Sequence, residues 1–171
     1  MKQTIQIALG LSAAILFLGC SRAHSGNVDT AKIRAKLDSI PLDQQVNLTN
    51  EEWQAILSPE QFHVMRQAGT EQACAAGNKL EYTSGIYVCS ACGNPLYRAE
   101  NKFNSGTGWP SFYQPIHPGA VQQKSGSEIF GSEILCGRCG SHLGHVFNDG
   151  PAPTGLRYCM NSVALKHRAD K

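Results

Sequence analysis

The sequence contains seven cysteines, and four of them form two matching pairs, Cys89-Ser90-Ala91-Cys92-Gly93 and Cys136-Gly137-Arg138-Cys139-Gly140. Two residues between thiolates, with a glycine after, let both sulfurs of a pair face one ion. Four thiolates then complete a closed tetrahedral zinc site, which we assign to stability because it leaves no open coordination position. Alternatively, each pair is a disulfide or a redox pair. Gly93-Asn94-Pro95 opposes the helix that a thioredoxin-like pair would begin.

Cys159 stands outside these pairs, in a run from Leu156 to Asn161 where polar and apolar residues alternate. In a strand, Arg157, Cys159 and Asn161 would share one face. A core strand would not place these three together unless that face meets solvent or a ligand. An arginine two residues away also favours the thiolate, which is the reactive form. The pattern predicts a nucleophilic Cys159, against the simpler alternative of a buried inert thiol.

Two further segments carry groups suited to a reactive site. His142 and His145 follow the second cysteine pair directly. They could bind a metal, but four thiolates already saturate one zinc, and imidazoles also exchange protons near pH 7. The loop from Ser105 to Phe112 is rich in Gly, Pro and aromatic residues and would present Trp109 as an aromatic wall, although a lone Trp is more often part of a core.

Together these segments resemble the type-B methionine sulfoxide reductases, over about Leu48 to Lys166. The resemblance implies reduction of the R epimer of methionine sulfoxide, free or in proteins, as repair after oxidative stress. It also implies a thiol, sulfenic acid and disulfide cycle that a thioredoxin-like protein completes. The motifs that carry it are Gly69-Thr70-Glu71, the two cysteine pairs, Gly108-Trp109-Pro110-Ser111-Phe112, His142-Leu143-Gly144-His145-Val146-Phe147 and Gly155-Leu156-Arg157-Tyr158-Cys159-Met160-Asn161-Ser162.

The resemblance also implies roles for individual residues. Cys159 would attack the sulfoxide sulfur, and His142 and His145 would help to bind and protonate its oxygen. Trp109 would pack against the terminal methyl group of the substrate. The other matched positions are Phe147 and Asn161 near the substrate and Arg157 near the nucleophile.

One position departs from the family pattern. Many members carry a second, resolving cysteine where this sequence has Thr107. Cys74 is the only unassigned thiol in the expected folded region, and we predict that it resolves Cys159. Alternatively, Cys74 takes no part and the reductant attacks the sulfenic acid directly.

The elements expected to position these residues begin with two short helices. Thr49 with Glu52, and Ser58 with Gln61, form capping boxes, and the second helix is expected to stop at Gly69. After Gly77, short apolar runs predict strands. We expect a mainly β fold with short N-terminal helices (α+β), with two small antiparallel sheets clamped by the zinc site like a tent. The predicted strands are 86–88, 133–135, 145–147, 156–160 and 163–165.

The first twenty residues predict an export signal. A short basic start and an apolar run end in Phe17-Leu18-Gly19-Cys20, which is similar to a bacterial lipobox. Cys20 would be acylated and would anchor the protein at the periplasmic face of a membrane; the alternative is a soluble periplasmic protein. We expect residues 21–47 to form a tether with a weak helical piece, and residues 48–168 to form the reductase domain.

Composition excludes some partners. The net charge is only +2, with no block of like charges, so we expect no nucleic-acid binding, and we expect a monomer. Two rival functions remain at this level. A zinc-ribbon interaction module would leave the face of Arg157, Cys159 and Asn161 unexplained. A metal-dependent hydrolase using His142 and His145 would keep its activity without Cys159.

Overall fold

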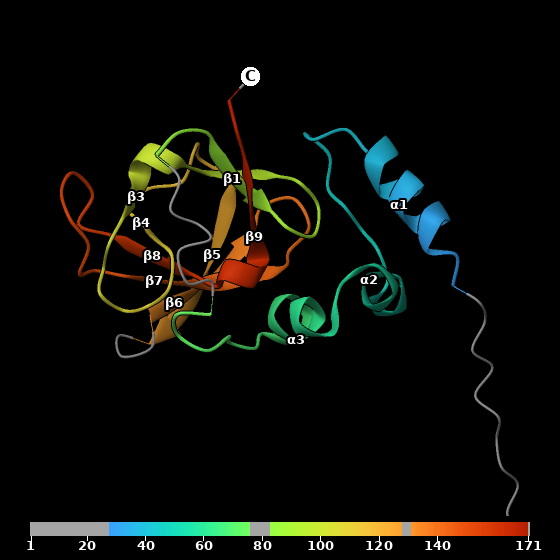
Figure 1. The fold of residues 1–171 in the computed structure, drawn as a ribbon, viewed down its shortest axis with the longest axis horizontal. Coiled ribbons are helices and arrows are strands. Elements are labelled where there is room, and N and C mark those ends of the chain that lie inside the picture. The colour runs from blue at the N-terminus through green and yellow to red at the C-terminus, as the bar shows by residue number, and fades with distance from the viewer. Residues whose placement is uncertain (1–27, 76–82, 128–130, 171) are drawn as a thin grey trace, which may run out of the picture.

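The computed structural model describes residues 28–75, 83–127 and 131–170 (Figure 1). In this part of the chain, three short helices lead into a body of short antiparallel strands. The helices lie together on one side of the strands, with α3 nearest to them. The helices are α1 (Thr30–Ser39), α2 (Asn50–Ile56) and α3 (Pro59–Gln67). The strands are β1 (Ile86–Cys89), β2 (Pro95–Arg98), β3 (Lys102–Phe103), β4 (Ser111–Phe112), β5 (Val121–Ser127), β6 (Gly131–Cys136), β7 (His142–Phe147), β8 (Arg157–Met160) and β9 (Leu165–Arg168).

The strands form two antiparallel sheets, which confirms the predicted fold class. The smaller sheet has the order β2-β1-β9, and the larger has the order β3-β4-β8-β7-β6-β5. An aromatic core joins them, since the rings of Tyr97 and Phe112 stack at 4.3 Å and the ring of Tyr87 meets Phe112 edge-on at 5.0 Å. All three side chains are fully buried.

Both predicted capping boxes are present. The Thr49 side chain accepts from the Glu52 amide at 3.2 Å while Glu52 accepts from the Thr49 amide at 2.8 Å, and Ser58 with Gln61 repeats this exchange around α3. The predicted end of α3 is off by one residue, because Ala68 (φ 54°) takes the left-handed conformation. Gly69 serves a different purpose, since a Cβ there would lie 2.5 Å from the imidazole of His63.

The helical piece expected within the tether of residues 21–47 is present. The weak helical pattern there is α1, whose Asp29 cap and buried Ile33 and Leu37 fix it against the domain. After α1, the buried guanidinium of Arg138 donates to the carbonyls of Ile40, Pro41 and Gln44. Because these bonds join residues far apart in the sequence, a local pattern of apolar residues does not predict them.

Four of the predicted strands correspond to β1, β6, β7 and β8. The prediction of a strand at 163–165 is wrong, because residues Ser162–Ala164 form a 3-10 turn and β9 begins at Leu165. The sequence patterns also missed β2 to β5. Of these, β3 and β4 have only two residues each, and β5 is a polar edge strand without an alternating pattern.

The predicted signal peptide, Cys20 and the first residues of the tether lie outside the described residues. Among the helices that the structure does describe, none is long and apolar enough to cross a membrane.

A buried carboxylate ties the segment after α3 to the end of β8. Glu71, only 7% exposed, accepts from the Ser162 amide, the Ser162 hydroxyl and the Val163 amide. The Glu71 amide in turn donates to the Asn161 side chain at 3.0 Å. The Gly69-Thr70-Glu71 motif is therefore a clamp between two segments about 90 residues apart.

We expect Glu71→Ala to lower the free energy of unfolding by about 3 kcal/mol, because hydrogen bonds to a charged group contribute about 1.5–3 kcal/mol each and the donors would be left buried. Urea unfolding of the metal-loaded protein, followed by tryptophan fluorescence, measures the change. Thr49→Ala is the matched control and should cost about 1 kcal/mol, as the loss of one helix cap. Equal stability of Glu71→Ala and wild type would contradict the clamp.

Candidate active site and metal centre

The two cysteine pairs meet in one buried cluster. The ligand atoms of Cys89, Cys92, Cys136 and Cys139 all lie within 4.8 Å of one another. The Sγ atoms of Cys89 and Cys139 are 3.9 Å apart and those of Cys92 and Cys136 are 3.7 Å apart, so each close contact joins the two pairs. All four cysteines are free, which argues against the disulfide alternative.

Each pair turns through a glycine in the left-handed region, Gly93 (φ 75°) and Gly140 (φ 66°). The glycine amide donates back to the carbonyl of the first cysteine, at 2.8 Å in one pair and 2.9 Å in the other. Because the sulfurs are so close, their pKa values move in opposite directions. Hydrogen bonds from Cys136, Cys89 and Cys92 lower the pKa of Cys139, whereas hydrogen bonds with Cys136 and Cys139 raise the pKa of Cys89. Buried thiolates this close repel one another unless a cation lies between them, so the donor set fits a metal ion.

Cys159 lies at the centre of the larger sheet. Its Cα is paired with Ser111 of β4 on one side and with His145 of β7 on the other. Tyr158 and Met160 are buried, whereas Arg157 and Cys159 are half-buried, so the predicted alternation along β8 is confirmed. A pocket of about 520 Å³ opens over Cys159. Its lining is Thr70, Trp109, Gly144, His145, Phe147, Cys159, Met160 and Asn161.

The predicted substrate residues line this pocket on a rigid frame. The Trp109 indole N–H donates to the Glu71 carbonyl at 3.3 Å. Asn161 is buried, and its amide group donates to the Leu143 carbonyl at 3.1 Å while its oxygen accepts from Glu71. The donor and the acceptor of the Asn161 side chain are therefore both bonded to the backbone, at Leu143 and at Glu71, so Asn161 holds the pocket wall in place.

The two histidines differ in position. His145 lines the pocket, while His142 is 3% exposed and stands behind it, with the ring centroids 5.3 Å apart. His142 Nδ1 donates to the Glu133 carboxylate at 2.9 Å, and its Nε2 is buried without a partner among the described residues. Burial first, and then nearby His142, lowers the pKa of His145, so its ring is neutral at pH 7.

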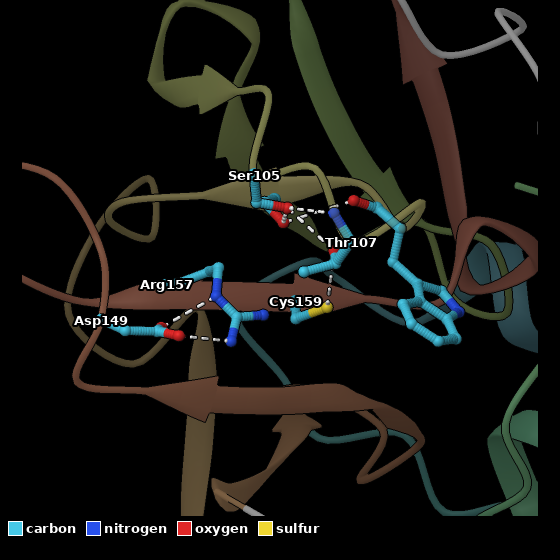
Figure 2. Close-up of polar contacts among 7 residues, drawn as sticks. Ser105, Thr107, Asp149, Arg157 and Cys159 are labelled. Carbon is cyan, nitrogen blue, oxygen red and sulfur yellow. Dashed lines mark hydrogen bonds and ion pairs between the residues drawn. The ribbon is translucent and has the colours of Figure 1, made fainter. Parts of the chain in front are cut away.

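Arg157 stands beside the nucleophile rather than in the pocket lining. Its guanidinium makes two 2.8 Å bonds to Asp149 (Figure 2). It also lies 4.3 Å from the Phe147 ring centroid. The bond with Asp149 raises the pKa of Arg157, and the charge of Cys159 adds to this. A fixed cation therefore lies close enough to Cys159 to interact with a thiolate.

The loop around Gly108 contacts both cysteines that the proposed chemistry needs, Cys159 through Thr107 and Cys74 through Gly108. The Thr107 hydroxyl is 3.8 Å from Cys159 Sγ. The Cys74 amide donates to the Gly108 carbonyl at 2.7 Å, and Cys74 Sγ packs so closely that a Cβ on Gly108 would lie 2.8 Å from it. Cys74 is exposed and lies outside the pocket lining, so the structure brings it to the loop that contacts Cys159 but not into the pocket.

Sequence patterns missed several residues that hold the site. Glu133 reaches His142 across a hairpin, and Asp149 reaches Arg157 across a loop, so neither has a spacing signal. Thr70 belongs to the Gly69-Thr70-Glu71 motif, and nothing in its type or spacing predicts its place in the pocket lining. The hydroxyls of Ser105 and Ser111 lie in the segment from Ser105 to Phe112, where Trp109 alone has a side chain that predicts a place in a pocket.

Comparisons with known proteins agree with this geometry. The SelR domain family model matches residues 57–169. A peptide methionine sulfoxide reductase MsrB of Leptospira interrogans is 49% identical over 131 residues, which cover 75% of this chain and 100% of that protein. Proteins of the same name from Methanosarcina barkeri (49% over 128 residues; 74% of this chain, 90% of that protein) and Acinetobacter baylyi (46% over 129 residues; 74% and 93%) are also similar.

The cluster predicts one tightly bound metal ion per chain. We expect Cys136→Ser to lose the ion and to unfold at lower temperature than wild type, because closed metal sites contribute directly to folding. Metal analysis of the purified protein and circular dichroism measure both effects. Ser90→Ala changes a residue between Cys89 and Cys92 that is not a ligand, so this variant should keep the metal. Full stability of the metal-free protein would contradict a structural role.

Proposed function

This chain belongs to the SelR-domain family of type-B methionine sulfoxide reductases, which are oxidoreductases, and from this premise we propose that it reduces the R epimer of methionine sulfoxide with Cys159 as the nucleophile. The substrate is methionine sulfoxide, free or within oxidised proteins, and the product is methionine.

One observation carries this proposal: Cys159, a neutral imidazole and an indole face the same pocket. The pocket has the apolar wall that a thioether methyl group needs, formed by Trp109 and Phe147. Its polar side is His145, whose Cα is paired with that of Cys159 across β7 and β8. Arg157 supplies positive charge near the sulfur, which favours the reactive thiolate.

The proposed reaction has three steps. The Cys159 thiolate attacks the sulfoxide sulfur, and His145, with His142 behind it, directs a proton to the oxygen. The protonated oxygen then moves from the methionine sulfur to the Cys159 sulfur as the bond between the two sulfurs breaks; methionine leaves with that electron pair, and Cys159 is left as a sulfenic acid. The thiol of Cys74 then displaces that oxygen as water and forms a Cys74–Cys159 disulfide. A thioredoxin-like dithiol exchanges with this disulfide and restores both thiols.

Two features support Cys74 as the resolving thiol. Its amide hydrogen bond and its sulfur both contact Gly108, next to the residue that touches Cys159. It also holds a left-handed backbone conformation (φ 64°), which costs a non-glycine residue about 1 kcal/mol. Cys74 is exposed and lies outside the pocket that Cys159 lines, so the Cys74 segment would move to form a disulfide, and movement would release this strain.

We also propose that the metal is zinc, since four buried thiolates in a closed set are the donors that structural zinc prefers. The ion supplies structural cross-linking and takes no part in the reaction. The hydrolase alternative is disfavoured, because His142 Nδ1 already binds Glu133 and only the four cysteines qualify as a metal site among the described residues. The interaction-module alternative does not account for the pocket over Cys159.

Export of the chain remains part of the proposal. Residues 1–20 would direct export, and Cys20 would carry a lipid anchor at the periplasmic face of the membrane. A monomer in that compartment would need a thioredoxin-like partner that also lies outside the cytoplasm.

An assay on separated R and S epimers tests the activity. Wild type should reduce the R epimer, and Cys159→Ser should lose at least about 1000-fold in kcat/KM, as expected for loss of a nucleophile. Cys74→Ser is the matched control in a single turnover, because it should still form methionine. Reduction that survives in Cys159→Ser but is lost to a chelator would instead favour a metal-dependent reaction.

The role of Cys74 predicts a specific disulfide. When wild type is oxidised with methionine sulfoxide, peptide mapping should recover Cys74 joined to Cys159. With a dithiol protein as reductant, turnover of Cys74→Ser should fall to the rate of direct attack on the sulfenic acid. Ala75→Ser, which is also exposed and close by, should behave as wild type. A Cys74→Ser variant with unchanged turnover would show that Cys74 takes no part.

A further inference from the structure

A chain of hydroxyl groups ends on the sulfur of Cys159. Thr107 Oγ1 lies 3.8 Å from Cys159 Sγ and 2.8 Å from Ser105 Oγ. Ser105 Oγ lies 2.8 Å from Ser111 Oγ, and Ser111 in turn donates to the Trp109 carbonyl at 3.3 Å (Figure 2). The chain therefore runs from the reactive sulfur to the backbone of the residue that supplies the aromatic wall.

The position of each hydroxyl is fixed by the fold. Ser111 lies on β4 with its Cα paired to Cys159, and its side chain is fully buried. The Thr107 amide contacts Ser105 Oγ at 3.5 Å, and the Gly106 amide donates to the Asn104 side chain at 2.9 Å. These bonds close a tight turn that brings the Thr107 side chain over the sulfur. A threonine at this place is thus held against Cys159 and is not free in solvent.

The hydrogen bonds in this chain can have only one of two directions, because each hydroxyl has a single hydrogen. When Ser111 donates to the Trp109 carbonyl, it must accept from Ser105. Ser105 must then accept from Thr107, so the hydrogen between Thr107 and Cys159 comes from the thiol. Once Cys159 is ionised, its sulfur can only accept, so Thr107 must donate to it. Ser105 then donates to Thr107 and accepts from Ser111, which releases the Trp109 carbonyl.

We propose that Thr107 is a catalytic residue that donates a hydrogen bond to the Cys159 thiolate, and that Ser105 and Ser111 are positioning residues that supply the reversible hydrogen-bond chain behind it. The proposal rests on the nucleophilic role of Cys159. The chain satisfies the sulfur in both protonation states, and its reversal requires only rotation of hydroxyl hydrogens. Thr107 and Arg157 therefore stabilise the same negative charge, one through a directional donor and the other through a fixed positive charge.

This arrangement gives the threonine a function of its own. A cysteine at position 107 would offer a second thiol but only a weak sulfur donor. A hydroxyl cannot form a disulfide, yet it donates strongly to an anion. The loop in this protein is therefore suited to activating Cys159, and resolution falls to a thiol elsewhere.

The test measures the reactivity of Cys159 directly, without a sulfoxide substrate. The full-length, metal-loaded protein is treated with iodoacetamide at pH 5 to 9, and mass spectrometry follows modification of the peptide that contains Cys159. We expect Thr107→Val to move the midpoint of this profile to higher pH and to slow alkylation at pH 7 by about tenfold, because a hydrogen bond to the charged form is lost. Thr107→Ser should restore the wild-type profile, and Ser105→Ala should shift it in the same direction by less.

Two controls separate this effect from general disturbance. Thr154→Val removes a hydroxyl that binds the Tyr113 carbonyl, away from the pocket, and should leave the profile unchanged. The exposed thiol of Cys74 in the same samples should be modified at the same rate in every variant. A Thr107→Val profile identical to wild type would overturn the proposal. If Thr107→Val does not fold, Ser105→Ala decides, and an unshifted profile there overturns it equally.

The outcomes also distinguish this proposal from the proposed function. If wild type reduces neither sulfoxide epimer, the function fails, whatever the alkylation profile shows. If the R epimer is reduced and the Thr107→Val profile is unshifted, only the role of Thr107 fails.

Discussion

The four-cysteine cluster is the constraint on which the rest of this structure depends. Cys89 ends β1 of the smaller sheet and Cys136 ends β6 of the larger one, so an ion held between them joins the two sheets. Strand β7 begins at His142, three residues after Cys139. The second cysteine pair, Cys136 and Cys139, therefore sets where β7 starts. The pairing of β7 with β8 then places His145 opposite Cys159. The cysteine cluster thus helps to determine where the imidazole meets the thiol, and an ion bound by four buried sulfur ligands would be part of the folded state.

Strand β8 presents Cys159 to the pocket and buries the residues on either side of it. Met160 accepts from the buried Tyr97 hydroxyl at 3.2 Å, and Tyr158 packs toward the same core, while Cys159 faces the pocket between them. Because strand side chains alternate, a slip of one residue would bury Cys159 and expose its apolar neighbours. The Glu71 clamp at Ser162 and Val163 opposes such a slip from the end of the strand. The same clamp fixes Trp109 and Asn161, so strand register and pocket shape are held together.

Much of this was predictable from local patterns, because those patterns report local physics. Capping boxes mark helix starts through bonds three residues apart, and the alternation at Arg157, Cys159 and Asn161 marks a strand with a polar face. The paired cysteines identified the metal centre through spacing alone. The failures share a cause, which is contact between residues distant in sequence. Arg138 binds the chain after α1 across more than 90 residues, and the Glu71 clamp spans a similar separation. Short or polar strands such as β4 and β5 also carry no periodic signal, although β4 places Ser111 beside Cys159.

The loop around Gly108 contacts two cysteines, Cys159 and Cys74, although neither of them belongs to the loop. On one side, Thr107 contacts Cys159 through its hydroxyl; on the other, the Gly108 carbonyl accepts from Cys74. Gly108 has a positive φ of 86°, and any side chain there would strike the Cys74 sulfur, so only glycine permits this packing. Cys74 lies outside the pocket that Cys159 lines, so in this arrangement the Cys159 sulfur is open to the pocket. If Cys74 is the resolving thiol that we propose, its segment has to move past this loop after the sulfenic acid forms, and the new disulfide would then stabilise the moved segment.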